Sequence, residues 1–144
     1  MPNRPISEVI HNQSITTATP DESVQRAAER MRAQQIGALM VVEDGHLVGI
    51  FTERDALYRV IAEGAEPGTV TVGQVMTRDP QTIDAGKPFR NALHMMFENG
   101  YRHVPVLKGG KPVGMVSARD ALGLDMLEFE SDLKMRENIT EILG

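Results

Sequence analysis

The chain repeats itself, and this internal repeat restricts the possible folds more than any other feature of the sequence. GIFTERDAL, at 49–57, and GMVSARDAL, at 114–122, are identical at five of nine positions and lie 65 residues apart. Further segments align at an offset of 65 or 66: 18–31 with 83–96, 36–50 with 101–115, and 6–10 with 72–76. One inserted residue before the first strand explains the change of offset. We therefore expect one unit over 5–64, its copy over 70–125, and a helical tail over 126–144.

Each unit is expected to follow the order β-α-β-β-α. TTAT, at 16–19, and QTID, at 81–84, look extended. After each of them, apolar residues recur at i, i+3, i+4 and i+7, the spacing of one helix face. These residues are Val24, Ala27, Ala28 and Met31 in the first unit, and Phe89, Ala92, Leu93 and Met96 in the second. Asp21 is the expected N-cap of the first helix, and Gly100 is the expected residue after the end of the second.

Two short apolar runs follow each of these helices. They are joined by EDGH in the first unit and by KGGK in the second, which predicts two β-hairpins. A further helix is expected to begin at Thr52 and, in the second unit, at Ser117, from where it continues into the tail. The tail carries apolar residues among many charges, and this stripe needs a partner in this chain or another: Leu124, Leu127, Leu133, Met135, Ile139 and Ile142.

Composition excludes several classes of function. The net charge is −5 and basic residues are interleaved with acidic ones, which argues against a nucleic-acid partner. The absence of cysteine excludes disulfides, thiolate metal sites and a cysteine nucleophile. No apolar run approaches the length of a membrane span, and the N-terminus lacks the apolar segment of a signal peptide. We expect a soluble cytoplasmic protein with no membrane partner.

The sequence predicts neither a metal site nor a catalytic site. The four histidines, at 11, 46, 94 and 103, show no spacing typical of metal ligands. GGKP, at 109–112, lacks the other residues of a phosphate-binding loop, and the hairpin turn explains it fully. No nucleophile–base pair and no carboxylate pair is recognisable, so we expect no enzyme and no catalytic cofactor.

The hydroxyl, arginine and aspartate at relative positions 0, +2 and +3 of the repeated motif carry the functional interpretation. Thr52 and Ser117 are first of all N-caps, since a hydroxyl there accepts from the free N–H groups of a helix. A phosphate at the same place gains N–H donors and the hydroxyl, and Arg54 or Arg119 can reach it. The aspartate is favoured by the helix dipole alone, but its carboxylate also matches the two hydroxyls of a ribose. The motif therefore pairs a phosphate end with a sugar end.

GIFTERD and GMVSARD, together with RHVPV at 102–106 and PDESV at 20–24, resemble the sequence elements of CBS domains, named after cystathionine beta-synthase. The resemblance covers 5 to about 125 and is that of a stand-alone tandem pair, a Bateman module. It implies an α/β (α+β) fold in which two β-α-β-β-α repeats pack through their sheets with pseudo-two-fold symmetry. Two clefts lie between the repeats in this family. Members often bind adenosine compounds there, and many form dimers.

The family pattern, transferred to matching positions, implies two nucleotide sites. In the first, Thr52 and Arg54 face phosphate, Asp55 holds the ribose, and Arg102 and His103 of the other unit add positive donors. The base of the first ligand is walled by Ile50, Gln81, Ile83, Tyr101 and Pro105. In the second, the polar residues are Ser117, Arg119 and Asp120, and the wall is formed by Thr16, Ala18, Ile36, Gly37, Ala38, Met40 and Met115.

The two implied sites differ in charge. Gly37 and Ala38 stand in the first unit where Arg102 and His103 stand in the second, and Met40 replaces a proline. The second site therefore lacks two cationic groups. We expect tighter binding of a phosphorylated ligand at the site of Asp55.

The resemblance implies a ligand-sensing regulatory module. Its expected ligand is AMP, ADP or ATP, with NAD(H) or S-adenosylmethionine as alternatives. Its output would pass through an unidentified regulated protein or through its own homodimer. The alternative is a structural dimerisation or interaction domain with degenerate clefts, against which the complete hydroxyl, arginine and aspartate sets in both units argue.

Overall fold

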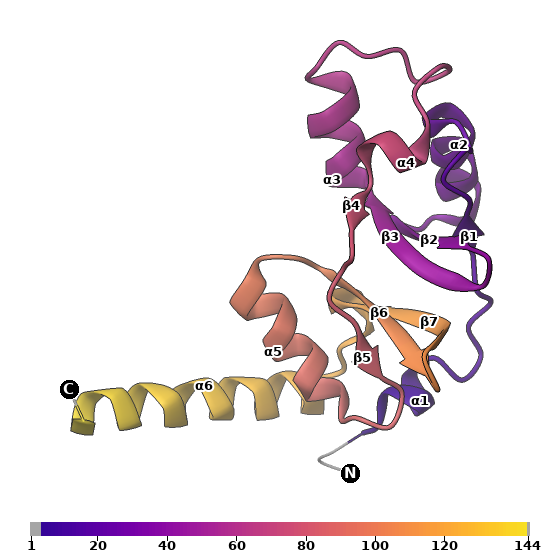
Figure 1. The fold of residues 1–144 in the computed structure, drawn as a ribbon. Helices are drawn as coiled ribbons and strands as arrows, with labels where there is room; N and C mark the ends of the chain where they lie inside the picture. Colours follow the sequence, from indigo (N-terminus) through magenta and orange to yellow (C-terminus); the bar gives the residue numbers. More distant parts are fainter. Residues whose placement is uncertain (1–3, 144) are drawn as a thin grey trace.

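The computed structural model describes residues 4–143 and has two similar halves, one above the other in Figure 1. The first eight elements in chain order are α1 (Ile6–Val9), β1 (Thr17–Ala18), α2 (Val24–Gln34), β2 (Ala38–Glu43), β3 (His46–Thr52), α3 (Glu53–Ala56), a π-helical segment (Leu57–Ile61) and α4 (Val72–Val75). The others are β4 (Thr77–Arg78), β5 (Ile83–Asp84), α5 (Phe89–Asn99), β6 (His103–Lys108), β7 (Lys111–Ser117), a 3₁₀ turn (Ala118–Asp120) and α6 (Gly123–Leu143).

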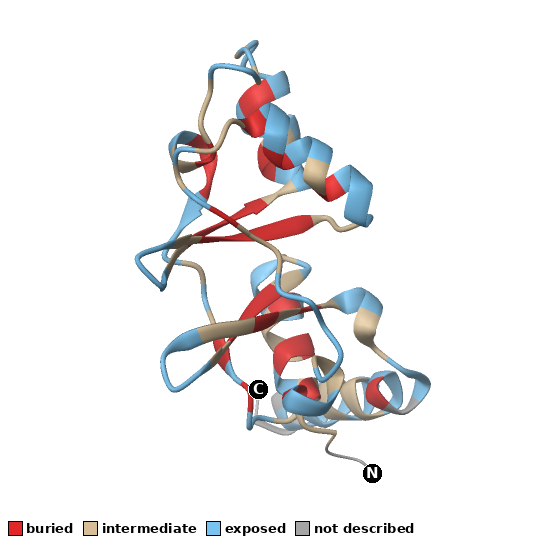
Figure 2. Ribbon diagram, turned by 90° about the vertical axis from the view of Figure 1, so that its right-hand side faces the viewer, coloured by how far each residue is buried: buried red, intermediate tan, exposed pale blue. Residues whose placement is uncertain are grey.

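Each half is built on its own sheet, which confirms the α+β class and the two hairpins. The first sheet has the order β1-β2-β3-β4 and the second β5-β6-β7. In both sheets a parallel pair precedes the antiparallel hairpin, and the register is repeated: Met40 pairs with Ile50 and Pro105 with Met115. The two sheets face one another across the middle of the molecule, with helices on their outer sides (Figure 2).

Each half has its own hydrophobic core, and the short opening helices are exchanged between the halves. Ile6 of α1 is fully buried in the core of the second half, where its N–H donates to the Lys87 carbonyl at 2.9 Å. Val72 of α4 is fully buried in the core of the first half, and its N–H donates to the Glu22 carbonyl at 2.8 Å. This exchange ties the repeats together because neither core is complete without the segment that opens the other repeat.

Two details of the helix ends differ from the sequence expectation, and one agrees with it. Ser23, not Asp21, caps α2: its hydroxyl accepts from the Arg26 N–H at 3.1 Å, while Asp21 accepts from the Thr19 hydroxyl. The helix expected to run unbroken from Ser117 into the tail is also wrong, because Ala121 is extended, with ψ 129°, and interrupts it. Gly100 ends α5 with φ 73°, as expected.

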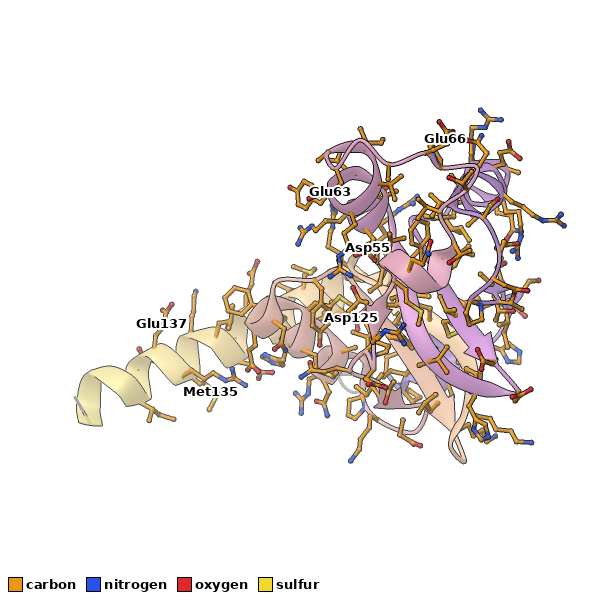
Figure 3. All side chains as sticks on the ribbon, turned by 45° about the horizontal axis from the view of Figure 1, so that its top comes forward. Asp55, Glu63, Glu66, Asp125, Met135 and Glu137 are labelled. Atoms are coloured by element: carbon orange, nitrogen blue, oxygen red, sulfur yellow. The ribbon has the colours of Figure 1, made fainter. Side chains whose placement is uncertain are left out.

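Helix α6 packs on α5 and then extends beyond it (Figure 1). The contact includes the His94 ring, whose Nε2 lies 2.8 Å from Asp132, and an edge-to-face pair of Phe97 and Phe129. The tail's expected apolar stripe is largely solvent-exposed, at Leu127, Met135 and Ile139. Met135 lies on the part of α6 that projects away from both halves (Figure 3). The expected stripe residues Leu124 and Ile142 have side chains outside the described part of the chain.

The two sheets differ where the opening segments pass beside them. In the first sheet, β4 pairs with β3 through Gly49 and Arg78. In the second, a side chain takes the place of a strand: the Gln13 amide accepts from the Met115 N–H at 2.7 Å and donates to the Met115 carbonyl at 2.8 Å. Each of the two connecting segments passes close to a glycine of the repeated motif, Gly49 or Gly114. A Cβ on Gly114 would lie 2.6 Å from the Gln13 side-chain oxygen.

Replacing Gly49 with alanine is expected to lower the free energy of unfolding by about 1–3 kcal/mol, the usual cost of overpacking. The new Cβ would lie 2.4 Å from the Met76 sulfur and 2.9 Å from the Thr77 carbonyl oxygen. Urea unfolding followed by circular dichroism measures the change. Gly68→Ala is the control, since the nearest atom there is 3.8 Å away on a side chain. Equal stability of the two variants would contradict the close passage of β4.

Candidate functional site

The first cleft, of about 740 Å³, lies between the β3–α3 corner and the entry to β6 in the other half. Small-molecule sites span about 300–1,000 Å³. Residues predicted for the first site that line it are Ile50, Thr52, Arg54, Asp55, Gln81, Tyr101, Arg102 and His103. They come from both repeats. The structure therefore brings together, around one cavity, residues as far apart in sequence as Ile50 and His103.

Ile83 and Pro105 were expected to wall this cleft and do not line it. Successive side chains of a strand point to opposite faces of the sheet. Ile83 faces the core of the second half, where it packs with the residues under β6. Pro105 lies between Val104 and Val106 of that core, so it points to the other face of the sheet, and it is fully buried there.

The β3–α3 corner is held by a reciprocal pair of hydrogen bonds. The Thr52 hydroxyl accepts from the Asp55 N–H at 3.2 Å, and Asp55 Oδ2 accepts from the Thr52 N–H at 3.0 Å. Oδ1 of Asp55 accepts from the Thr77 hydroxyl at 3.3 Å and lies 3.7 Å from Nε of Arg59. Asp55 is only 6% exposed. Asp55 is thus a helix cap, and a ligand in the cleft would share Oδ1 with Thr77.

The equivalent corner after β7 has the same cap and a less occupied aspartate. The Ser117 hydroxyl accepts from the Arg119 N–H at 3.3 Å, and Asp120 Oδ2 accepts from the Ser117 N–H at 2.8 Å. Oδ1 of Asp120 has no hydrogen bond to any residue in 4–143. Only one 3₁₀ turn follows this corner, so aligned peptide dipoles add little here. An anion at this corner would depend on the hydroxyl and the guanidinium.

The second cleft, of about 350 Å³, lies beside this corner. Residues predicted for the second site that line it are Thr16, Ile36, Gly37, Ala38, Met40, Met115, Ser117, Arg119 and Asp120. Ala18 was also expected in the wall, but it lies 3% exposed in the core of the first half, because β1 turns this side chain inward. The cleft is smaller than the first and has one guanidinium in its lining, whereas the first has those of Arg54 and Arg102.

A central pocket of about 200 Å³ shares lining residues with both clefts. It shares Glu53, Arg102 and His103 with the first cleft, and it shares the segment 35–37, His103, Ser117 and Arg119 with the second. His103 lines all three cavities. The pocket and the two clefts therefore adjoin one another around His103, and together we call them the channel.

His103 is held mainly in its neutral form at the middle of this channel. Burial is the largest cause and lowers its pKa below the usual 6.5. Glu53 and Asp120 oppose this fall, while the positive charges of Arg102 and Arg119 add to it. A neutral imidazole offers one donor and one acceptor, whereas a bound anion would favour the charged form with two donors.

Several lining residues were missed by the sequence analysis. In the first cleft these are Glu53, Leu57, Tyr58, Thr77, Asp79, Pro80, Asn99 and Gly100. In the second they are Gln13, Ser14, Ile15, Gln34, Gln35 and His103. Glu53 could have been predicted as a lining residue, because it stands inside the repeated motif between Thr52 and Arg54. Thr77 and Gln13 could not have been predicted as lining residues. Both lie on the connecting segments, whose path between the sheets does not follow from the repeat.

The structure adds two negative findings within residues 4–143. No group of three histidine, aspartate or glutamate side chains is placed to hold a metal ion. No helix there is both long enough and apolar enough to cross a membrane.

Comparison with known proteins gives a consistent picture. The model of the CBS domain matches residues 6–62 and 72–126. The mitochondrial CBS domain-containing protein CBSX3 of Arabidopsis thaliana is 34% identical over 121 residues, which cover 81% of this chain and 59% of that protein. Hypoxic response protein 1 of Mycobacterium tuberculosis is 33% identical over 112 residues, covering 77% of this chain and 78% of that protein. The chain therefore spans less than two thirds of CBSX3.

Solved structures with this fold include two useful neighbours. The CBS-domain containing protein ATU1752 of Agrobacterium tumefaciens is 30% identical, with a TM-score of 0.74, and the match covers 81% of this chain and 94% of that one. The CBS domain protein PAE2072 of Pyrobaculum aerophilum, solved as a complex with AMP, has a TM-score of 0.79 at 20% identity, covering 88% of this chain and 98% of that one. At that identity the second likeness concerns the fold alone.

The depressed pKa of His103 predicts a pH-dependent stability. Below pH 6.5 the unfolded chain takes up a proton at this residue before the folded chain does, so the free energy of unfolding falls as the pH falls through 6.5. Urea unfolding between pH 8 and pH 5.5, in a buffer without phosphate, measures the change. His103→Gln is expected to lose this part of the pH dependence, while the exposed His11→Gln control keeps it. Identical profiles for the wild type and His103→Gln would contradict the assignment.

Proposed function

Because the chain belongs to the CBS-domain family, we propose that it is a regulatory module that binds adenosine-containing ligands in the two clefts. The observation that carries the proposal is the pair of corners at which a hydroxyl, an arginine and an aspartate line a cleft completed by the other repeat. These groups match a phosphate and a ribose, and apolar residues such as Ile50 and Met115 offer walls to a base. AMP, ADP and ATP are the proposed ligands, with NAD(H) and S-adenosylmethionine as alternatives. The AMP complex of PAE2072 supports an adenine nucleotide for a chain of this fold.

The first cleft is the proposed site of tighter binding for a phosphorylated ligand. It is the larger cavity, and its lining includes Arg54 and Arg102, whose planar guanidinium groups suit phosphate. The carboxylates of Glu53 and Asp79 in the same lining repel an anion. They therefore reduce the attraction that the two guanidinium groups exert on a phosphate. In the second cleft, the Asp120 carboxylate has fewer hydrogen bonds within the protein than Asp55 has. This cleft is therefore suited to a ligand whose sugar contributes more to the binding free energy than its phosphate does.

The proposed output is a change in what a partner protein or a second copy of the chain contacts, without catalysis by this chain. A ligand shifts such an equilibrium only by its different affinity for the two states. Both clefts are built from both repeats, so an occupied channel would favour one spacing of the two sheets. The exposed stripe of Leu127, Met135 and Ile139 on α6 favours the alternative function, a dimerisation or interaction domain whose clefts carry no ligand.

Asparagine substitutions at the two corner aspartates test the site assignment. Asn keeps an oxygen that can accept from the N–H of the N-cap residue, but it loses the charge that strengthens a bond to a ribose hydroxyl. Asp55→Asn is expected to weaken AMP binding at the first cleft about tenfold, or roughly 1.4 kcal/mol. Asp120→Asn is expected to weaken only the second binding event. Calorimetric titration with AMP measures both events.

The outcomes separate the hypotheses. If both variants weakened the same event equally, the assignment of two separate sites would be wrong. Thermal melting with adenosine, AMP, ADP, ATP, NAD and S-adenosylmethionine tests the ligand class, since a ligand at 100 times its dissociation constant stabilises a fold by roughly 2.7 kcal/mol. The absence of a shift with every one of these compounds would favour the interaction domain.

A further inference from the structure

We infer that the two clefts share one phosphate-binding pocket, so that nucleotides with long phosphate chains exclude one another from the two sites. This inference rests on the proposed function and adds a rule of coupling between the clefts. It predicts that adenosine fills both clefts independently, and that each added phosphate makes the second binding event weaker relative to the first.

The first step is the adjacency of the three cavities, all of which are lined by His103. The proposed phosphate ends of the two clefts, at Thr52 and at Ser117, belong to the two strands that end beside the central pocket. Ala38 pairs with Thr52, and His103 pairs with Ser117, in the same register of the two hairpins. Ligands held at both corners would therefore direct their phosphate chains toward one another and into the same pocket.

The second step is the size and charge of that pocket. Its volume is about 200 Å³, a little over a quarter of the first cleft's 740 Å³. Among its described lining residues, the permanent cations are Arg102 and Arg119 and the acid is Glu53, so their formal charge sums to +1. His103 is mainly neutral in the free protein because burial lowers its pKa, and its charged form, which a bound anion favours, would add one further positive charge at most. Two triphosphates would bring far more negative charge than these groups balance, and like charges about 4 Å apart repel by several kcal/mol at an effective dielectric constant of about 20.

The third step is an asymmetry on the pseudo-two-fold axis. The Glu53 N–H donates to the Gly37 carbonyl at 3.0 Å, and in the other repeat the Ala118 N–H donates to the Arg102 carbonyl at 3.1 Å. These two bonds are equivalent, yet one repeat contributes an acid and a glycine where the other contributes an alanine and an arginine. A Cβ on Gly37 would lie 3.3 Å from the Glu53 carboxyl carbon, so this carboxylate lies directly over the glycine at the pocket wall. Glu53 thus lowers the pocket's capacity for anions.

The test is a calorimetric series with adenosine, AMP, ADP and ATP on the whole chain in EDTA, so that no divalent cation neutralises the phosphates. We expect two binding events for adenosine and for AMP, a growing ratio of the second dissociation constant to the first through ADP, and one event for ATP. A constant ratio along the series would overturn the inference. A single event for AMP would also overturn it, because there would then be no second occupant to exclude.

Glu53→Gln provides an independent readout. Removal of this charge from the shared pocket is expected to tighten ATP binding roughly tenfold more than adenosine binding, the effect of a unit charge about 12 Å away at an effective dielectric constant of about 20. Glu63→Gln is the matched control, since Glu63 is exposed after the π-helical segment (Figure 3) and lines none of the three cavities. Equal gains for ATP and adenosine, or the same gain in the control, would overturn the inference.

Failure of the proposed function gives a different result from failure of this inference. If neither adenosine nor any of the nucleotides produced binding heat or a melting shift, the clefts would not be nucleotide sites at all. If all of them bound twice with the same ratio of constants, the clefts would be nucleotide sites without a shared pocket.

Discussion

The reciprocal hydrogen bonds at the two strand-to-helix corners are the interaction on which the rest of the structure depends. At each corner a hydroxyl and a carboxylate satisfy the backbone N–H groups that a helix start leaves unpaired. The cap fixes the direction in which the chain leaves the sheet, and so it fixes where the following arginine lies relative to the other repeat. Stability and the proposed binding site are therefore served by the same atoms, most clearly in Asp55, whose carboxylate has a partner on each oxygen.

The sequence predicted the architecture because hydrophobic periodicity and a repeat are local and redundant signals. Both hairpins and the extended first strands follow from patterns written twice, and the end of α5 follows from Gly100. Apart from the N-cap of α2 and the break at Ala121, its differences from the structure concern the direction of single side chains. Ala18, Ile83 and Pro105 were assigned to cleft walls from the family pattern, but the alternation of strand faces and the burial of each position decide which side chains reach a cavity. The hydrogen bond from Thr77 to Asp55 could not be predicted either, because it depends on the path of the connection between the repeats.

The two repeats share a fold but not a charge distribution, and the difference is concentrated at their junction. One repeat supplies Arg102 and His103, and the other supplies Glu53 beside a glycine. Such changes leave both cores intact, since none of these side chains belongs to either buried cluster. The two repeats thus have the same fold, and the different residues along the axis between them make their charges unequal without a loss of packing.

The missing fourth strand of the second sheet has a consequence for solubility. Unpaired sheet borders recruit strands from other chains and promote aggregation, and proteins counter this with charges, prolines or local cover. On β7, the amide of Gln13 occupies both backbone groups of Met115, while the strand begins with Lys111 and Pro112, a charge and a residue without an N–H. A single glutamine, lysine and proline thus close the border that β4 closes in the other half, and they leave little room for β-augmentation by a foreign strand.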